Sequence, residues 1–166
     1  APITSAAVAG VLSSTLPDIN MVSAPTIARD KGIAITETKK DEHSAYESYI
    51  RINLVSKKEK FSIGGTIFSD GHPRIVQING INLEAGLMPN MLYVTNKDVP
   101  GLIGSLGNIL GDEKINIASF NLGRTGPLKD AIALIGVDKA VNDNVIKEVE
   151  KLDSVVQVKS LNFNII

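Results

Sequence analysis

The chain has 166 residues, with 17 lysines and arginines against 18 aspartates and glutamates, and it contains no cysteine. The balanced charge and the scattered aromatic residues make nucleic-acid binding unexpected, and the missing cysteines exclude disulfides and thiolate metal sites. No apolar run approaches the roughly 18 residues of a membrane span, and no secretory leader pattern opens the sequence, so we expect no membrane partner and a cytoplasmic protein. Because Ala1 rather than Met comes first, we expect a piece of a larger protein.

The first half of the chain predicts two short helices and then a run of strands. Apolar residues over 6–12 give a helix that ends before Pro17, because proline cannot continue a helix. A second helix starts at Ser23, with Pro25 in its first turn and Gly32 at its end. Strands are expected at 19–22, 33–38, 48–56, 60–68 and 74–78.

These strands carry signals of antiparallel pairing. Polar and apolar residues alternate over 49–55, which predicts one buried and one solvated sheet face. The Gly64-Gly65 pair predicts a bulge, and Asn79-Gly80 predicts a tight hairpin because both residues tolerate positive φ. Residues 1–88 are therefore expected to form a small α/β domain dominated by an antiparallel sheet.

From Asn90 the pattern changes to strand, helix, strand, strand, helix, strand. Apolar residues with helical spacing mark a first helix over 99–110, closed by Gly111, and a second over 145–152. The remaining strands are expected at 115–122, 131–137 and 155–163. A βαββαβ order with right-handed crossovers predicts a ferredoxin-like fold over 89–166, so the whole chain is assigned to the α/β (α+β) class.

The turn between the first strand and the first helix of this half is the candidate site. Asp98 stands where a carboxylate can cap the helix, and Pro100 stands where its missing N–H is harmless. One interpretation is therefore a capped helix and nothing more. The other is an α-amino-acid site, in which the helix N-terminus holds the ligand carboxylate while Asp98 and amide oxygens such as that of Asn96 hold its ammonium.

Glycines recur along the helix that follows this turn. Gly101, Gly104 and Gly107 are three residues apart, whereas a dinucleotide fingerprint needs its first two glycines one residue apart. We therefore expect no cofactor in this chain, and we expect the glycines to serve close packing or to leave room for a ligand.

Residues 91–117 resemble the first half of an ACT domain, and residues 20–166 resemble the C-terminal regulatory part of a bacterial-type D-3-phosphoglycerate dehydrogenase. The resemblance implies that L-serine, or another small amino acid, is bound at Asn96, Asp98, the Pro100-Gly101 pair and Asn116. The family commonly has His or Tyr where this chain has Asn96. It also pairs two ACT domains edge to edge with the ligand between them, which implies a homo-oligomer, expected to be a dimer.

The resemblance further implies a regulatory role without catalysis. Serine would act as a feedback inhibitor in L-serine biosynthesis, and the oxidoreductase chemistry and its NAD would belong to an upstream catalytic region. No catalytic or metal-binding residue is expected here, because the two histidines, His43 and His72, have no carboxylate at ligand spacing.

Residues 63–80 resemble the intervening, or allosteric substrate-binding, domain that precedes ACT in the longer dehydrogenases. The resemblance makes Arg74 a candidate anion contact, against the alternative of a solvated arginine at a strand end. The same domain pair occurs in L-serine dehydratases, but that family begins with a segment rich in Ser and His, whereas residues 1–30 have no His. A third possibility, a free-standing amino-acid sensor or dimerisation module, is disfavoured by Ala1 in place of Met.

Overall fold

The computed structural model describes residues 1–40, 45–127 and 129–164. The chain divides into two compact units, Ala1–Ser44 and Ala45–Ile166. The candidate site lies entirely within the second unit. The predicted boundary between residues 88 and 89 separates two expected domains rather than these two compact units, and it remains a prediction.

The first unit is a helix pair, α1 (Pro2–Ser13) and α2 (Ala24–Asp30). The helices pack through Leu12, Ala24 and Ala28, all buried. As predicted, α2 starts with Ser23 as N-cap and ends before Gly32, whose φ is 73°.

The two strands predicted in this unit are wrong. Residues 19–22 form a turn in which Oδ1 of Asn20 accepts hydrogen bonds from the N–H groups of Val22 and Ser23. Residues 33–38 have no regular structure, because a strand needs a partner and this unit has none among its described residues. A hydrogen bond from Thr4, followed by the charge of the chain's amino group, lowers the pKa of Glu37 in that segment.

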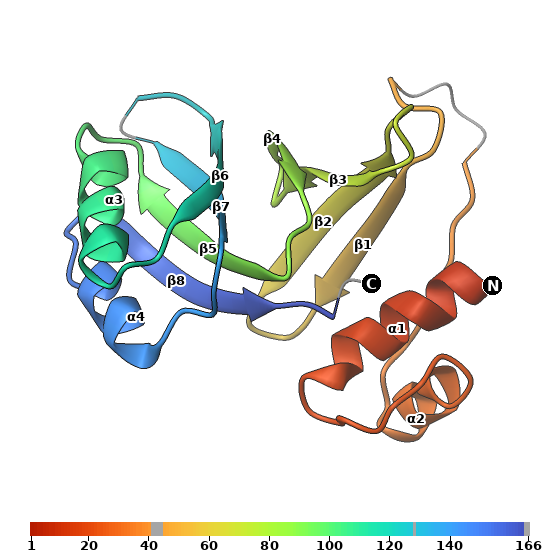
Figure 1. Cartoon of the computed structure of the whole chain (residues 1–166). Helices are drawn as coiled ribbons and strands as arrows, with labels where there is room; N and C mark the ends of the chain where they lie inside the picture. Colours follow the sequence, from red (N-terminus) through yellow and green to blue (C-terminus); the bar gives the residue numbers. More distant parts are fainter. Residues whose placement is uncertain (41–44, 128, 165–166) are drawn as a thin grey trace. The chain divides into compact units, whose positions relative to one another are not determined.

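The second unit contains two four-stranded sheets (Figure 1). The first sheet is an antiparallel meander of β1 (Ile50–Val55), β2 (Lys60–Ile67), β3 (Pro73–Ile78) and β4 (Ile81–Gly86). The Asn79-Gly80 hairpin is confirmed by φ values of 49° and 79°, and the Gly64-Gly65 bulge by a shift of register. Strand β4 was not predicted.

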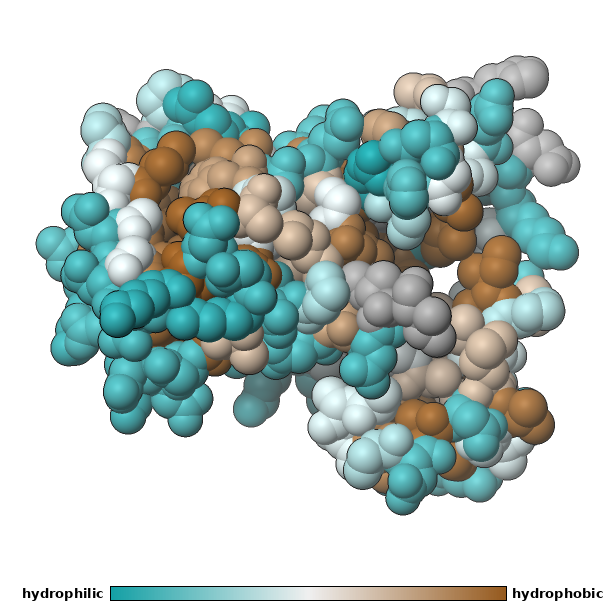
Figure 2. All heavy atoms as spheres, viewed as in Figure 1, coloured by the Kyte–Doolittle hydropathy of each residue, from teal (hydrophilic) through white to brown (hydrophobic). Residues whose placement is uncertain are grey.

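Strand β1 departs from the predicted alternation of buried and solvated residues. Only Ile52 is half-buried, while Ile50, Leu54 and Val55 are 45%, 40% and 70% exposed. The strand lies at the edge of its sheet, so it contacts a single neighbouring strand. Figure 2 shows that the face it draws carries apolar patches among hydrophilic side chains.

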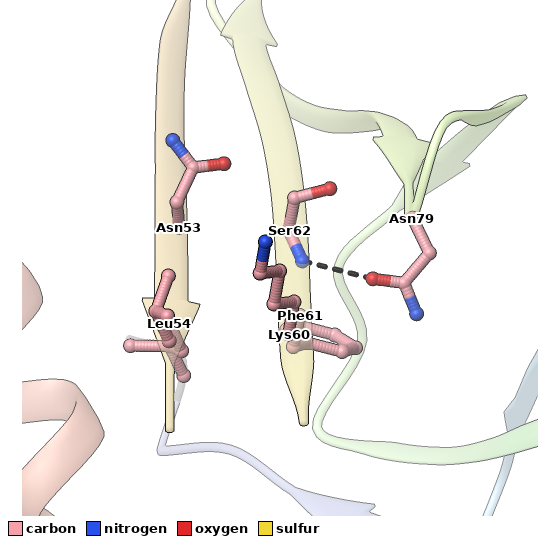
Figure 3. Close-up of a pocket in the computed structure, with 7 residues that line it drawn as sticks. Asn53, Leu54, Lys60, Phe61, Ser62 and Asn79 are labelled. Carbon is pink, nitrogen blue, oxygen red and sulfur yellow. Dashed lines mark hydrogen bonds between the residues drawn. The ribbon is translucent and has the colours of Figure 1, made fainter. Parts of the chain in front are cut away.

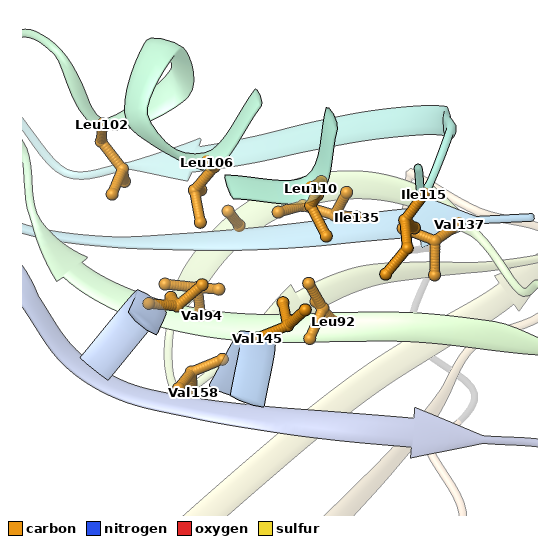
Figure 4. Close-up of a cluster of buried hydrophobic side chains, with 12 residues drawn as sticks. Leu92, Val94, Leu102, Leu106, Leu110, Ile115, Ile135, Val137, Val145 and Val158 are labelled. Carbon is orange, nitrogen blue, oxygen red and sulfur yellow. The ribbon is translucent and has the colours of Figure 1, made fainter. Parts of the chain in front are cut away.

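The second sheet has the predicted βαββαβ order. Its elements are β5 (Asn90–Lys97), α3 (Leu102–Asp112), β6 (Ile117–Arg124), β7 (Asp130–Val137), α4 (Asp143–Glu150) and β8 (Val155–Asn162). The strand order is β6-β7-β5-β8, with all neighbours antiparallel. Both helices cover one face, and Leu92, Leu106, Ile135 and Val145 are fully buried between the layers (Figure 4).

The opposite face of this sheet packs against the first sheet. Their shared core joins Ile78, Ile81 and Ala85 to Met91, Ile132 and Leu134. Strand β4 crosses β6 so closely that a Cβ atom on Gly123 would lie 2.7 Å from the Asn82 carbonyl oxygen. The glycine is therefore required by the contact between the sheets.

Both predicted ends of α3 need correction. The helix begins at Leu102 after Gly101, whose φ is 99°, so Pro100 precedes the helix rather than lying in its first turn. At the other end, Gly111 lies inside the last turn, and Lys114, with φ of 55°, takes the left-handed position expected of the glycine.

Candidate functional site

The turn from β5 into α3 is held in place by the loop that joins β6 to β7. The Asp98 N–H donates to the carbonyl oxygen of Lys129 at 2.8 Å, and the Val99 N–H donates to that of Lys97 at 2.9 Å. Gly101 then turns the chain into the helix with a φ that other residues avoid. The helix then begins at Leu102, four residues after Asp98, and no side-chain cap from the described residues pairs its first N–H groups, which form the positive end of the helix.

The Asp98 carboxylate binds Arg124 rather than capping the helix. Its Oδ2 accepts a hydrogen bond from Nε of Arg124 at 2.7 Å, and α3 has no side-chain cap within the described chain. The capping interpretation of Asp98 is therefore wrong. The aspartate side chain is 13% exposed and the arginine side chain 55%, so the pair lies at the surface with its acidic half sheltered.

Asn96 is the buried polar residue of the site. It is 3% exposed, its Nδ2 donates to the Lys97 carbonyl oxygen at 2.9 Å, and its Oδ1 is buried with no hydrogen-bond partner in the described parts of the chain. A buried acceptor left unpaired costs roughly 1–3 kcal/mol. Such an atom is a candidate to receive a hydrogen bond from a ligand.

Asn116 lies away from the other predicted residues. It is exposed just before β6, where its N–H donates to Oδ1 of Asp138 at 3.0 Å and its carbonyl accepts from the Asp138 N–H at 3.1 Å. Asp98 and Asn116 flank opposite ends of α3, whose 11 residues span about 16 Å. One chain therefore does not bring Asn116 to a small amino acid held at Asp98.

Arg74 lies on β3 within a cluster of rings and charges. Its Nη2 donates to Oδ2 of Asp70 at 2.8 Å, and its guanidinium lies 5.2 Å from the ring centroid of Phe68. The hydrogen bond from the His72 N–H, together with the charge of Arg74, lowers the pKa of Asp70. Arg74 is thus already paired with a carboxylate.

A shallow groove of about 610 Å³ lies at the other end of the first sheet (Figure 3). Its lining comes from β1, β2 and the β3–β4 hairpin, where Oδ1 of Asn79 accepts from the Ser62 N–H at 2.8 Å. None of the predicted site residues lines it.

Other site types receive no support from the described residues. Across 1–40, 45–127 and 129–164, no group of three His, Asp or Glu residues could hold a metal ion. His72 is exposed, and His43 lies outside the described residues. No helix in the described parts is long and apolar enough to span a membrane.

Both halves of the chain match known domain families. Residues 1–79 match the D-3-phosphoglycerate dehydrogenase intervening domain, and residues 90–154 match the ACT domain. The chain is 30% identical to D-3-phosphoglycerate dehydrogenase of Bacillus subtilis over 161 residues, 96% of this chain and 31% of that protein. Identity to the protein of the same name from Methanocaldococcus jannaschii is 34% over 156 residues, 92% of this chain and 29% of that protein. The chain thus spans less than a third of these relatives.

Proposed function

The chain belongs to the regulatory region of the D-3-phosphoglycerate dehydrogenase family, as an intervening domain followed by an ACT domain, and we propose that its ACT half binds L-serine as a feedback signal. Two observations carry the proposal: among the described residues, the buried Oδ1 of Asn96 has no hydrogen-bond partner, and the nearby N-terminus of α3 has no side-chain cap. A zwitterion needs acceptors for its ammonium and donors for its carboxylate, and this turn provides both.

The second part of the proposal is a site shared between two chains. Asn116 and its own Asp98 flank opposite ends of α3, a helix about 16 Å long, so a contribution of Asn116 to a ligand at Asp98 requires a second copy. Strand β6, which follows Asn116, is an edge strand of its sheet and has no charged residue before Arg124. Uncharged edges of this kind pair readily with another chain. We expect light scattering to give a dimer, and a 17.7 kDa monomer that still binds serine would contradict the shared site.

Regulation would act on a catalytic region that lies in the longer enzyme, outside the 166 residues of this chain. In the full-length cytoplasmic enzyme, serine bound here would lower the rate of an NAD-dependent oxidation. Such an effector acts by shifting an equilibrium between a more active and a less active state of the enzyme. It can do so only through its different affinity for the two states, typically about 1–3 kcal/mol. Steady-state kinetics of the full-length enzyme with and without L-serine tests this, and an unchanged rate at saturating serine would contradict it.

Binding itself is tested by calorimetric titration of this chain with L-serine, glycine, L-alanine and D-serine. We expect L-serine to bind most tightly. The intervening-domain match favours the dehydrogenase assignment over the L-serine dehydratase alternative. If none of the four amino acids gives heat at millimolar concentration, the sensing role is wrong.

A separate anion site at Arg74 is also proposed, because its guanidinium is fixed against Phe68 and near the carboxylate of Asp70. An anion would have to displace Asp70 or share the guanidinium with it. Titration with inorganic phosphate tests this proposal. Equal binding by the wild-type chain and by Arg74→Gln would contradict it.

A further inference from the structure

Three residues lie in one row across the end of the second sheet. Asn96 on β5 pairs with Ala131 on β7, and Ala131 pairs with Arg124 on β6. Residues opposite each other on antiparallel strands direct their side chains to the same face, here the face that α3 and α4 cover. Two strand spacings separate the backbones of Asn96 and Arg124 by about 10 Å, and Ala131 lies on the strand between them.

The guanidinium of Arg124 is held at one edge and open at the other. Its Nε donates to Asp98, whereas Nη1 and Nη2 have no hydrogen bond or ion pair with any described residue. A guanidinium fixed in this way presents two parallel N–H donors with the spacing of a carboxylate. Its side chain is 55% exposed, so a ligand can reach those donors from solvent.

The opposite end of the row offers the complementary group. The Oδ1 atom of Asn96 is a buried acceptor that no described residue pairs, which suits an ammonium but not a carboxylate. The row therefore has an acceptor at one end and a fixed cation at the other. An α-amino acid carries the matching pair of charges.

We propose that Arg124 binds the ligand's carboxylate and makes the site select amino acids over amines, an inference that rests on the proposed amino-acid binding. Asp98 then acts as a positioning residue that holds the guanidinium through Oδ2. The N-terminus of α3 carries only about half a positive charge. Arg124 supplies a full charge and a bidentate geometry that the helix end lacks.

The test compares L-serine with L-serinamide, in which a neutral amide replaces the carboxylate. Wild-type protein should bind L-serine at least about tenfold more tightly than the amide, as expected for a charge-assisted bond. Arg124→Gln should bind L-serine at least about tenfold more weakly and lose the discrimination, and Arg124→Lys should restore part of it.

Lys97→Gln is the matched control. Lys97 ends β5 one residue from Asn96, is 54% exposed and has its own ion pair with Asp130. The control removes the same charge and should keep wild-type affinity and discrimination. L-serine binding by Arg124→Gln within threefold of wild type would overturn the role of Arg124 and leave the proposed function intact. Failure of wild-type protein to bind any amino acid would overturn both.

Discussion

Gly123→Ala tests the packing of the first sheet onto the ACT sheet. The new Cβ would lie 2.7 Å from the Asn82 carbonyl oxygen and 2.8 Å from Cγ2 of Ile81 on β4. Both distances are shorter than a van der Waals contact, and the carbonyl belongs to a paired strand that cannot move alone. The φ of Gly123 is not in the left-handed region, so the effect of an alanine there is steric rather than conformational.

Overpacking of this kind costs about 1–3 kcal/mol. A loss of about 2 kcal/mol lowers the Tm of a chain of this size by about 4–8 °C. Gly104→Ala is the control, because Gly104 is exposed in α3 and a Cβ there would meet nothing within 4 Å. That alanine should stabilise the helix by about 0.5–1 kcal/mol.

The measurement is urea unfolding of the three proteins followed by circular dichroism, with thermal melts in parallel. We expect Gly123→Ala to lose stability and Gly104→Ala to gain it. A Gly123→Ala protein within 0.5 kcal/mol of wild type would show that β4 does not press against β6 as described.

Three further changes probe other parts of the second unit. Asp98→Ala should abolish the heat of L-serine binding in calorimetry. It should lower the free energy of unfolding in urea by less than about 1 kcal/mol, because its partner Arg124 is exposed and no helix cap is lost. An unfolded variant would contradict this. Asn142→Ala removes the Oδ1 that accepts a hydrogen bond from the Val145 N–H at 3.0 Å at the start of α4. The lost cap should lower the free energy of unfolding by about 1 kcal/mol in the same assay. An unchanged unfolding midpoint would refute the cap. Burial raises the pKa of Tyr93 above 10.0, so its contribution to stability is complete below that pH and is lost as the pH rises through the folded-state value. Tyr93→Phe should therefore flatten the alkaline fall in unfolding free energy, and an identical pH profile would refute that effect of burial.

The ACT half was predictable because its signals are local and repeated. The 3.6-residue periodicity around Leu106 and Val145 and the strand pattern of β7 fix element type and order, and both agree with the structure. The ends of α3 were predicted less well. Each end is set by a residue with positive φ, Gly101 at the start and Lys114 at the end, and the choice of lysine rather than the nearby Gly111 for that conformation cannot be predicted from residue type.

The errors in the first half have a different origin. Residues 33–38 read as a strand by composition, but strand formation depends on a partner that the sequence does not name. The opposite error occurred at β4, where Glu84, Ala85 and Gly86 are poor strand formers and pairing with β3 decides the outcome.

The partner of Asp98 could not be predicted from spacing. Asp98 and Arg124 are 26 residues apart, and they meet because β6 and β5 both pair with β7. Only the register of three strands places Arg124 in the row of Asn96. The assignment of the site to this turn remains a prediction, and the charge that Asp98 faces depends on contacts between distant segments.

The most direct measurement is the calorimetric titration of the 166-residue chain with L-serine, combined with its mass by light scattering at the same concentration. The proposed function predicts saturable heat with a preference for L-serine over D-serine, and a dimer throughout the titration. Absence of heat with every small amino acid at millimolar concentration would contradict amino-acid binding by the ACT half.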